Sequence, residues 1–118
     1  MLASATLRFL GRADILDKVR ERDADVSPGG DRDDPGKITA ILKHGDMPSD
    51  LAVNPPEGVI RGVDKIAFLD CTATLPVTKA PTGWWYRGQP VKAGAPITFQ
   101  TDAYIARGVI TGVTFSPR

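Results

Sequence analysis

Acidic side chains gather in one polar stretch, residues 23–34, with the sequence D-A-D-V-S-P-G-G-D-R-D-D. Counted from Asp23, oxygen-bearing side chains fall at the third, fifth, ninth and twelfth positions, which are Asp25, Ser27, Asp31 and Asp34. That spacing is typical of a calcium loop, but Pro28 stands where such loops need glycine and Asp34 where they carry a longer glutamate. We therefore predict a solvated loop whose aspartates cap turns, and no metal site. Calcium binding by this loop stays an alternative.

The candidates for acid–base or nucleophilic chemistry are few. His44, the one histidine, lies in the turn-like His44-Gly45-Asp46, and the G-x-S-x-G context that would supply a serine nucleophile is absent. The sequence also lacks a P-loop, a G-x-G-x-x-G motif and any His/Cys set at metal-ligand spacing. The carboxylates Asp64, Asp70 and Asp102 fall on or near predicted strands without a spacing that pairs two of them. We therefore predict that the protein is not an enzyme and has no cofactor.

The single cysteine, Cys71, excludes an intramolecular disulfide. It lies in an apolar, strand-like run, residues 65–77, and we predict that it is a small buried hydrophobic residue.

A cluster of aromatic residues gives the strongest indication of a contact surface. Trp84, Trp85, Tyr86 and Arg87 follow one another. Three consecutive aromatic residues cannot all face one side of a strand, so at least one must point away from the core. Trp and Tyr are favoured at interfaces, and an arginine beside them can stack or pair with a phosphate or carboxylate. We predict an interaction surface at these four residues, with plugging of the core by one tryptophan as the alternative.

Composition limits the fold class and the partners. The 118 residues predict one domain, residues 1–118, and 42% hydrophobic and 25% charged residues are ordinary for a folded protein. A net charge of +1 with interspersed signs argues against nucleic-acid binding. No run reaches the ~18 apolar residues of a membrane span, and residues 1–10 do not form a signal-peptide core.

Periodicity predicts mostly strands. Residues 4–10 alternate as a strand, and residues 13–22 have the apolar spacing of a short amphipathic helix that covers one end of a sheet. Further predicted strands are residues 37–43, 59–61 and 65–77; a turn at 44–46, a surface excursion at 47–58, a hairpin at 78–83 and a closing β unit at 91–115 complete the chain.

A fainter copy of that closing unit occurs earlier. Both copies run from an apolar residue (Val26, Ile97) through a polar loop to Gly-x-Ile-Thr, which begins at Gly36 and at Gly108. The glycines differ by 72 in residue number, too far apart for a solenoid repeat. We predict a mainly β protein with one short helix, a small β-barrel or sandwich, with two pseudo-symmetric halves or a chance echo as the open alternatives.

The closing unit, residues 91–113, resembles the C-terminal signature of an uncharacterised bacterial family, domain of unknown function four-three-three-zero. The opening strand (residues 5–9), residues 15–26 and the segment from Gly36 to Ile41 also look like that family's first half. Its members usually carry an N-terminal transmembrane helix directly before the first strand. The resemblance implies a membrane-anchored extracytoplasmic domain, in the periplasm or at the cell surface, attached through a segment absent from this chain.

The sequence therefore predicts a non-catalytic envelope domain that acts in assembly or binding. Its partners would be other envelope proteins or lipid, with oligomer formation open. The loop–glycine–strand pattern is also similar to the mammalian-cell-entry barrels of lipid transport, so a lipid- or hydrophobic-ligand-carrying barrel is the alternative. A small hydrolase-like enzyme around His44 or Asp70 is the second alternative.

Overall fold

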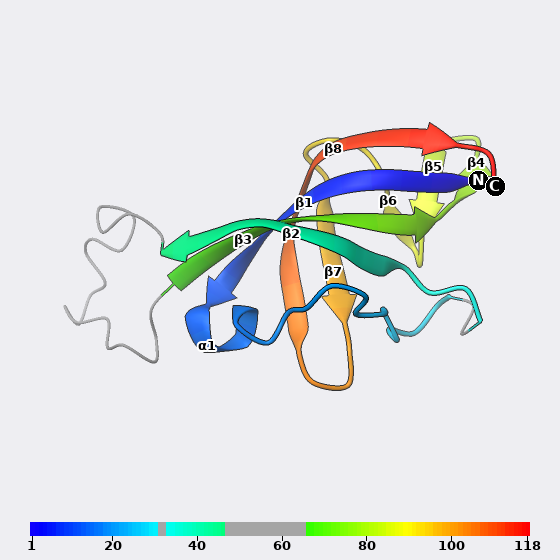
Figure 1. Ribbon diagram of the computed structural model, residues 1–118. Coiled ribbons are helices and arrows are strands. Elements are labelled where there is room, and N and C mark those ends of the chain that lie inside the picture. Colours follow the sequence, from blue (N-terminus) through cyan, green and yellow to red (C-terminus); the bar gives the residue numbers. More distant parts are fainter. Residues whose placement is uncertain (31–32, 47–65) are drawn as a thin grey trace.

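Strands make up most of the described chain. The computed structural model describes residues 1–30, 33–46 and 66–118 (Figure 1). In chain order the elements are β1 (Leu2–Arg12), α1 (Ala13–Leu16), β2 (Lys37–Asp46), β3 (Ile66–Pro76), β4 (Thr78–Ala80), β5 (Gly83–Tyr86), β6 (Gln89–Pro90), β7 (Pro96–Gln100) and β8 (Ile105–Ser116). The prediction of a mainly β protein with one short helix is confirmed.

The strands form two antiparallel sheets. The larger has the order β2-β3-β1-β8-β7, and the smaller has the order β4-β5-β6. In Figure 1 the small sheet lies at the end of the large one where both chain termini also lie. Neither sheet closes on itself within the described residues, so the predicted barrel is wrong and the predicted sandwich is consistent with the structure.

Alternation along the two central strands places the core on one face of the large sheet. Every second residue of β1 and β3 is buried, and the residues between them face outward. The buried members are Ala3, Ala5, Leu7, Phe9, Ala67, Leu69, Cys71, Ala73 and Leu75. The Phe9 ring meets the Phe99 ring of β7 at a centroid distance of 6.3 Å. Burial of each large side chain stabilises the fold by about 1.5–3 kcal/mol.

The helix is shorter than predicted. It ends at Leu16 instead of residue 22, because the chain then turns to run beside β2. Arg22 has a left-handed backbone (φ 72°), and its N–H donates to the Ile38 carbonyl of β2 (2.8 Å) instead of to a helical carbonyl. Leu16 and Val19 are nevertheless buried, so the apolar positions were right and the helical period was wrong.

The predicted turn at 44–46 is also wrong. These residues complete β2, where Gly45 pairs with Phe68 of β3. The hairpin at 78–83 is confirmed by the pairing of β4 with β5. The predicted excursion at 47–58 and the strand at 59–61 lie outside the described residues.

The echo in the sequence is a structural repeat. Three backbone hydrogen bonds within residues 20–38 recur, with similar lengths, between the residues whose numbers are higher by 72. In the first copy, the N–H of Arg22 donates to the Ile38 carbonyl (2.8 Å), that of Ile38 to Asp23 (3.0 Å) and that of Asp23 to Arg20 (3.3 Å). In the second copy, the N–H of Gly94 donates to the Ile110 carbonyl (2.7 Å), that of Ile110 to Ala95 (2.9 Å) and that of Ala95 to Lys92 (3.1 Å). Arg22 and Gly94, one such pair, both have positive φ (72° and 89°). Chance does not explain agreement at this level, and the interpretation of two pseudo-symmetric halves is supported.

The repeat extends to a β-bulge in each half. Thr39 is the extra residue where β2 pairs with β3, and Thr111 is the extra residue where β8 pairs with β1. The Thr39 hydroxyl lies 2.6 Å from that of Thr72, and the Thr111 hydroxyl donates to that of Thr6 (2.9 Å). The match equates β2 with β8 and β3 with β1 about an approximate twofold axis that passes between Thr6 and Thr72.

The two halves are interleaved. β1 and β2 belong to the first half, yet β1 pairs with β8 and β2 pairs with β3, both from the second half. Each Gly-x-Ile-Thr strand is therefore held by a strand of the other half. In the second copy, a Cβ at Gly108 would overlap the carbonyl of Arg8 in β1, so this crossing requires glycine.

Candidate functional site

A buried carboxylate lies where the two free edges of the large sheet approach each other. Asp25 has no exposed surface. Its N–H donates to the Gly36 carbonyl beside β2 (2.9 Å), and the next residue, Val26, donates its N–H to the Gln100 carbonyl of β7 (2.8 Å). Residues 24–26 thus contact both edge strands without forming a continuous ladder. We call this junction the seam.

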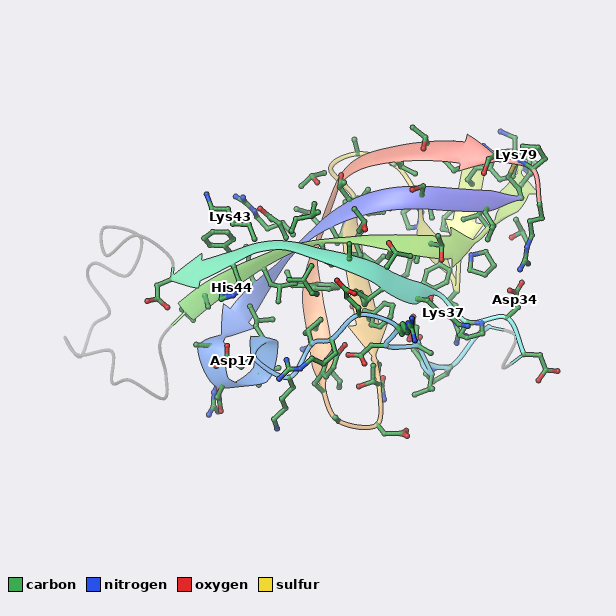
Figure 2. The ribbon with its side chains drawn as sticks, viewed as in Figure 1. Asp17, Asp34, Lys37, Lys43, His44 and Lys79 are labelled. Atoms are coloured by element: carbon green, nitrogen blue, oxygen red, sulfur yellow. The ribbon has the colours of Figure 1, made fainter. Side chains whose placement is uncertain are left out.

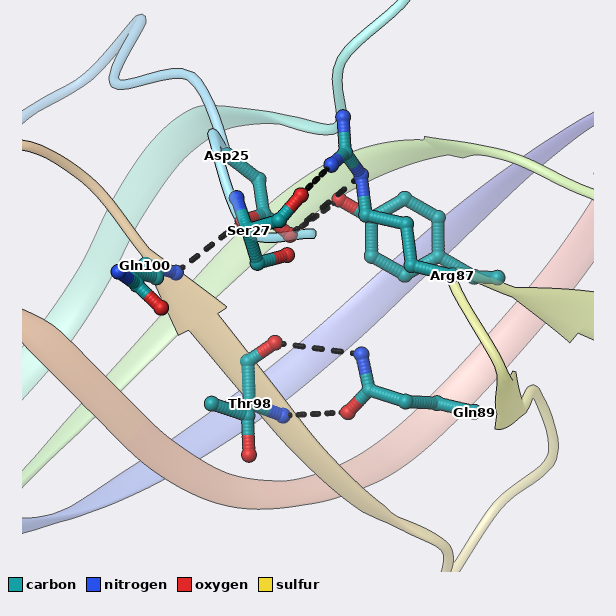
Figure 3. Close-up of polar contacts among 7 residues, drawn as sticks. Asp25, Ser27, Arg87, Gln89, Thr98 and Gln100 are labelled. Carbon is teal, nitrogen blue, oxygen red and sulfur yellow. Dashed lines mark hydrogen bonds and ion pairs between the residues drawn. The ribbon is translucent and has the colours of Figure 1, made fainter. Parts of the chain in front are cut away.

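The Asp25 side chain fastens the seam (Figure 3). Its Oδ1 accepts hydrogen bonds from the backbone N–H groups of Ser27 (2.9 Å) and Gln100 (3.2 Å). Its Oδ2 accepts one from the Tyr86 hydroxyl (2.5 Å), and the Arg87 Nε lies 3.9 Å away. A buried charge is tolerated when it is paired and hydrogen-bonded in this way. These contacts join the polar loop, β7 and the end of β5 at one carboxylate.

Tyr86 is part of this buried junction. Its side chain is buried, and burial, followed by the hydrogen bond to Asp25, raises the pKa of the Tyr86 hydroxyl above its ordinary value. The hydroxyl therefore stays protonated and acts as a donor. A Cβ at Gly36 would overlap this hydroxyl, so the glycine that begins the first Gly-x-Ile-Thr unit makes room for Tyr86.

Arg87 also lies inside. Its side chain is 5% exposed, its Nη1 donates to the Ser27 carbonyl, and its guanidinium lies over the Tyr86 ring at 5.7 Å. Its backbone is left-handed (φ 48°), which turns the chain from β5 toward β6, and Gly30 has no side chain that would collide with it. Of the four residues predicted to form an interaction surface, Tyr86 and Arg87 therefore have buried side chains. Both are held inward by the loop that contains Asp25.

The two tryptophans take opposite sides of β5. The Trp84 ring stacks on Phe115 at 5.3 Å, and the Lys79 ammonium, labelled near the termini in Figure 2, lies over it at 5.2 Å. Trp85 donates its Nε1–H to the Thr82 hydroxyl (3.1 Å) and lines a shallow hollow of about 460 Å³ together with Met1 and other residues. Both tryptophans are half-buried, so of the predicted contact surface these two remain at the boundary with solvent.

A second tyrosine–aspartate pair joins the turn between β7 and β8 to residues 20–23. The Tyr104 hydroxyl donates to Asp23 Oδ2 (2.6 Å), and the Arg20 N–H donates to the same oxygen (2.9 Å). Burial first, and then this hydrogen bond, raises the pKa of the Tyr104 hydroxyl above its ordinary value. The contact fixes the β7–β8 turn against residues 20–23.

The aspartates of the calcium-like loop serve separate contacts. Asp23 binds Tyr104, Asp25 fastens the seam, and Asp34 accepts hydrogen bonds from Arg118, with Oδ1 to Nη2 at 2.7 Å. Asp31 lies outside the described residues. Among the residues that the structure describes, no three His, Cys, Asp or Glu side chains gather closely enough to hold a metal ion.

The remaining candidates are dispersed. His44 is exposed on β2 and lines a hollow of about 260 Å³ with Asp17, on the side of the sheet where α1 lies (Figure 2). The described residues around that hollow include no Ser, Thr or Cys that could serve as a nucleophile. Asp70 pairs with Arg8 at 2.7 Å, Asp102 is exposed, and Asp64 lies outside the described residues.

Cys71 is fully buried, as predicted. Burial raises the pKa of its thiol to about 12, so it is a core residue and not a reactive thiolate.

The seam was missed at the sequence level. The proposed echo aligned Val26 with Ile97, whereas the shift of 72 aligns Asp25 with Ile97. Ile97 pairs with Gly108 just as Asp25 bonds to Gly36, and both side chains are buried. A correct alignment would have placed a carboxylate at an inward position, and a buried carboxylate implies donors nearby. Within the described residues, every buried side-chain nitrogen or oxygen has a hydrogen-bond partner.

We compared the chain with family models, curated proteins and solved structures. No family model, curated protein or solved structure matches the chain. Within the described residues, no helix has the length and apolar character needed to cross a membrane.

Proposed function

We propose that the protein is a non-catalytic binding or assembly module of a bacterial envelope protein, and that its Trp84–Trp85 end lies against the membrane. The observation that carries this proposal is the position of Trp85, the neighbour of Trp84 on β5, beside Met1. The Val77 N–H donates to the Met1 carbonyl (3.2 Å), and Met1 and Trp85 line the same hollow.

The position of Met1 connects the aromatic residues with the family resemblance. Members of the family that the chain resembles carry a transmembrane helix directly before the first strand. A helix attached there would enter the bilayer close to Trp84 and Trp85. Half-buried tryptophans with an exposed lysine (Lys79) and arginine (Arg118) nearby suit the headgroup region, where aromatic rings and basic side chains are favoured.

The use of the buried polar groups supports a module without chemistry of its own. Asp25 accepts a hydrogen bond from Tyr86 and lies beside Arg87, and Arg87 also donates to the Ser27 carbonyl, so all three residues take part in closing the seam. The lipid-carrying barrel and the small hydrolase remain alternatives with less support. The first needs an internal space where Phe9, Leu7, Ile97 and Phe99 pack, and the second needs a nucleophile near His44.

The membrane proposal is tested by tethering the chain through its N-terminus. A polyhistidine tag before Met1 holds the protein on vesicles of phosphatidylethanolamine and phosphatidylglycerol that contain a nickel-chelating lipid. Bromine atoms on the lipid chains quench tryptophan fluorescence at short range. We expect quenching in brominated vesicles, and we expect Trp85→Ser to remove most of it, because Trp84 is shielded by Phe115.

The control uses the same tethered protein on vesicles without bromine. Circular dichroism verifies that the Trp85→Ser variant keeps its strands. A tethered, folded protein whose fluorescence is equal in brominated and ordinary vesicles would contradict the proposal.

A further inference from the structure

The face of the large sheet that looks away from α1 carries an unusual share of exposed apolar side chains. Of the seven large hydrophobic residues exposed within the described chain, four lie on or beside this face: Leu10, Leu42, Ile66 and Val109. Single exposed hydrophobic residues need no explanation, but contiguous ones mark interaction sites. The question is therefore whether these four are neighbours.

The strand register makes them neighbours. Leu10 of β1 lies opposite the half-buried Phe68 of β3. Ile66, two residues before Phe68, lies on the same face. Val109 of β8 lies opposite Arg8 of β1. Leu42, the extra residue of a second bulge in β2, reaches across to line a hollow of about 320 Å³ with Arg8, Asp70, Thr6 and Thr111. We call Arg8, Leu10, Leu42, Phe68, Asp70 and Val109 the outer patch.

The centre of the outer patch is rigid and internally neutral. Arg8 donates from Nε and Nη2 to the two carboxylate oxygens of Asp70 (2.7 and 2.9 Å). Its guanidinium carbon also lies 4.8 Å from the centre of the Phe68 ring. A fixed arginine over an aromatic ring is the composition of binding hot spots between proteins. Since its charge is already balanced by Asp70, Arg8 has little electrostatic attraction for a phosphate-rich surface.

The outer patch is complementary to itself. At one level of the sheet the outward side chains are Lys43 on β2, Asp70 on β3, Arg8 on β1 and Val109 on β8. A twofold rotation about an axis parallel to the strands, between β1 and β3, exchanges these two strands between facing copies. Asp70 of each copy then lies over Arg8 of the other, uncharged Thr6 lies over Thr72, and the aliphatic part of Lys43 lies over Val109. From this charge pattern we infer that the protein forms a dimer in which two outer patches pack face to face.

This geometry agrees with how sheets associate. Sheets that pack face to face lie about 10 Å apart with their side chains between them. Leu10, Leu42 and Val109 would lose their exposed surface in the dimer, and isologous contacts of this kind are the commonest oligomeric interface. The dimer does not depend on the membrane proposal, because the Trp84–Trp85 end lies at the opposite end of β1.

The test compares two arginine substitutions at equally exposed positions. Leu42→Arg changes a side chain that is 57% exposed in the outer patch, and Val26→Arg changes one that is 54% exposed at the seam. Neither removes the Arg8–Asp70 pair. Sedimentation equilibrium should give about twice the 12.6 kDa chain mass for the unchanged protein and for Val26→Arg, and the chain mass for Leu42→Arg.

Each outcome decides the inference. Thermal melting by circular dichroism at low concentration verifies that Leu42→Arg is folded, and Val109→Arg serves as a second variant if it is not. An unchanged protein that stays monomeric up to about 100 μM overturns the inference, since stable dimers have dissociation constants well below that. A dimer that survives both Leu42→Arg and Val109→Arg overturns it too. Binding of the monomer to lipid vesicles that Leu42→Arg abolishes would assign the outer patch to a membrane instead.

Discussion

The two copies of the repeated unit have the same backbone and opposite chemistry at one inward position. Ile97 in the second copy is an ordinary core residue of a regular hairpin, β7–β8. Asp25, its counterpart in the first copy, is equally buried and collects donors from Ser27, Tyr86 and Gln100. The same backbone segment can thus be stabilised by apolar packing or by a buried carboxylate that accepts several hydrogen bonds.

The difference has a geometric cause. After Ile97 the second copy continues as a strand beside β8, and the Gln89 side chain satisfies the outward N–H and carbonyl of Thr98 (2.7 and 3.3 Å; Figure 3). After Asp25 the first copy leaves β2 and crosses to β7. A chain that leaves its ladder exposes backbone donors to the interior, and a carboxylate can accept several of them.

Exchange of the differing residue should give the largest effect. Asp25→Ile places the residue of the second copy into the first, leaves the Tyr86 hydroxyl and the Gln100 N–H without this acceptor, and removes the carboxylate beside Arg87. We expect the free energy of unfolding to fall by about 3–5 kcal/mol, as for other broken buried ion pairs. Urea denaturation followed by circular dichroism measures it. A loss below about 1 kcal/mol would mean that the carboxylate is dispensable for the seam.

The two equivalent glycines should respond differently to alanine. At Gly108 the new Cβ would overlap the β1 backbone at Arg8, which cannot move aside, and we expect a loss near the upper end of the 1–3 kcal/mol range for overpacking. At Gly36 the overlap is with the Tyr86 hydroxyl, so we expect a loss of about 1–2 kcal/mol.

A double variant separates the two causes of the glycine requirement. Tyr86→Phe removes the hydroxyl that Gly36→Ala would meet, so the two changes together should cost less than the sum of the single losses. Gly108→Ala should simply add to Tyr86→Phe. Equal, additive behaviour at both glycines would show that Tyr86 is not the reason for Gly36.

The smallest expected change in the free energy of unfolding concerns the Arg8–Asp70 ion pair, which has no counterpart related by the approximate twofold axis. The symmetry places Ser4 and Thr74 where Asp70 and Arg8 lie at the other end of the sheet. The side-chain hydrogen bond from Arg8 is the main cause that lowers the pKa of Asp70 below its ordinary value. A carboxyl whose pKa is lower in the folded state stabilises the fold above its unfolded-state pKa, and this contribution disappears as the pH falls through the folded-state pKa.

We therefore expect Asp70→Asn to reduce the free energy of unfolding by less than about 1 kcal/mol at neutral pH, because the pair is partly exposed. The difference between the two proteins should shrink toward zero in acid. Denaturation at a series of pH values, below the concentration at which dimers form, measures it. A difference that grows on acidification has the wrong sign for this pair.

Local pattern in the sequence was enough for the strands but not for the seam. Period-2 alternation located β1 and β3, and the burial of Cys71 followed from its place in such a run. The helix at 13–22 was overestimated because Leu16 and Val19 are apolar at helical spacing, while hydrogen bonds to β2, distant in the sequence, decide the backbone there. Propensity carries no information about those partners.

The aromatic cluster shows the same limit. Alternation correctly implied that Trp84 and Trp85 face opposite ways, and Tyr86 follows Trp84 inward. The burial of Tyr86 and Arg87 depends on Asp25, which is 61 residues from Tyr86. A pairing over that separation is visible only after the two repeats are aligned at the correct residue.

The interleaving of the halves also constrains how the chain reaches its native state. β1 comes first among the described strands, but one of its two neighbours, β8, consists of residues 105–116. The central strand β1 therefore lacks one neighbour until β8 has been synthesised, and such long-range pairings form slowly. The first half cannot complete its strand pairing alone, since β1 and β2 both pair with strands of the second half. Exposed strand edges are prone to aggregate, so the nascent chain is vulnerable until β8 has paired with β1.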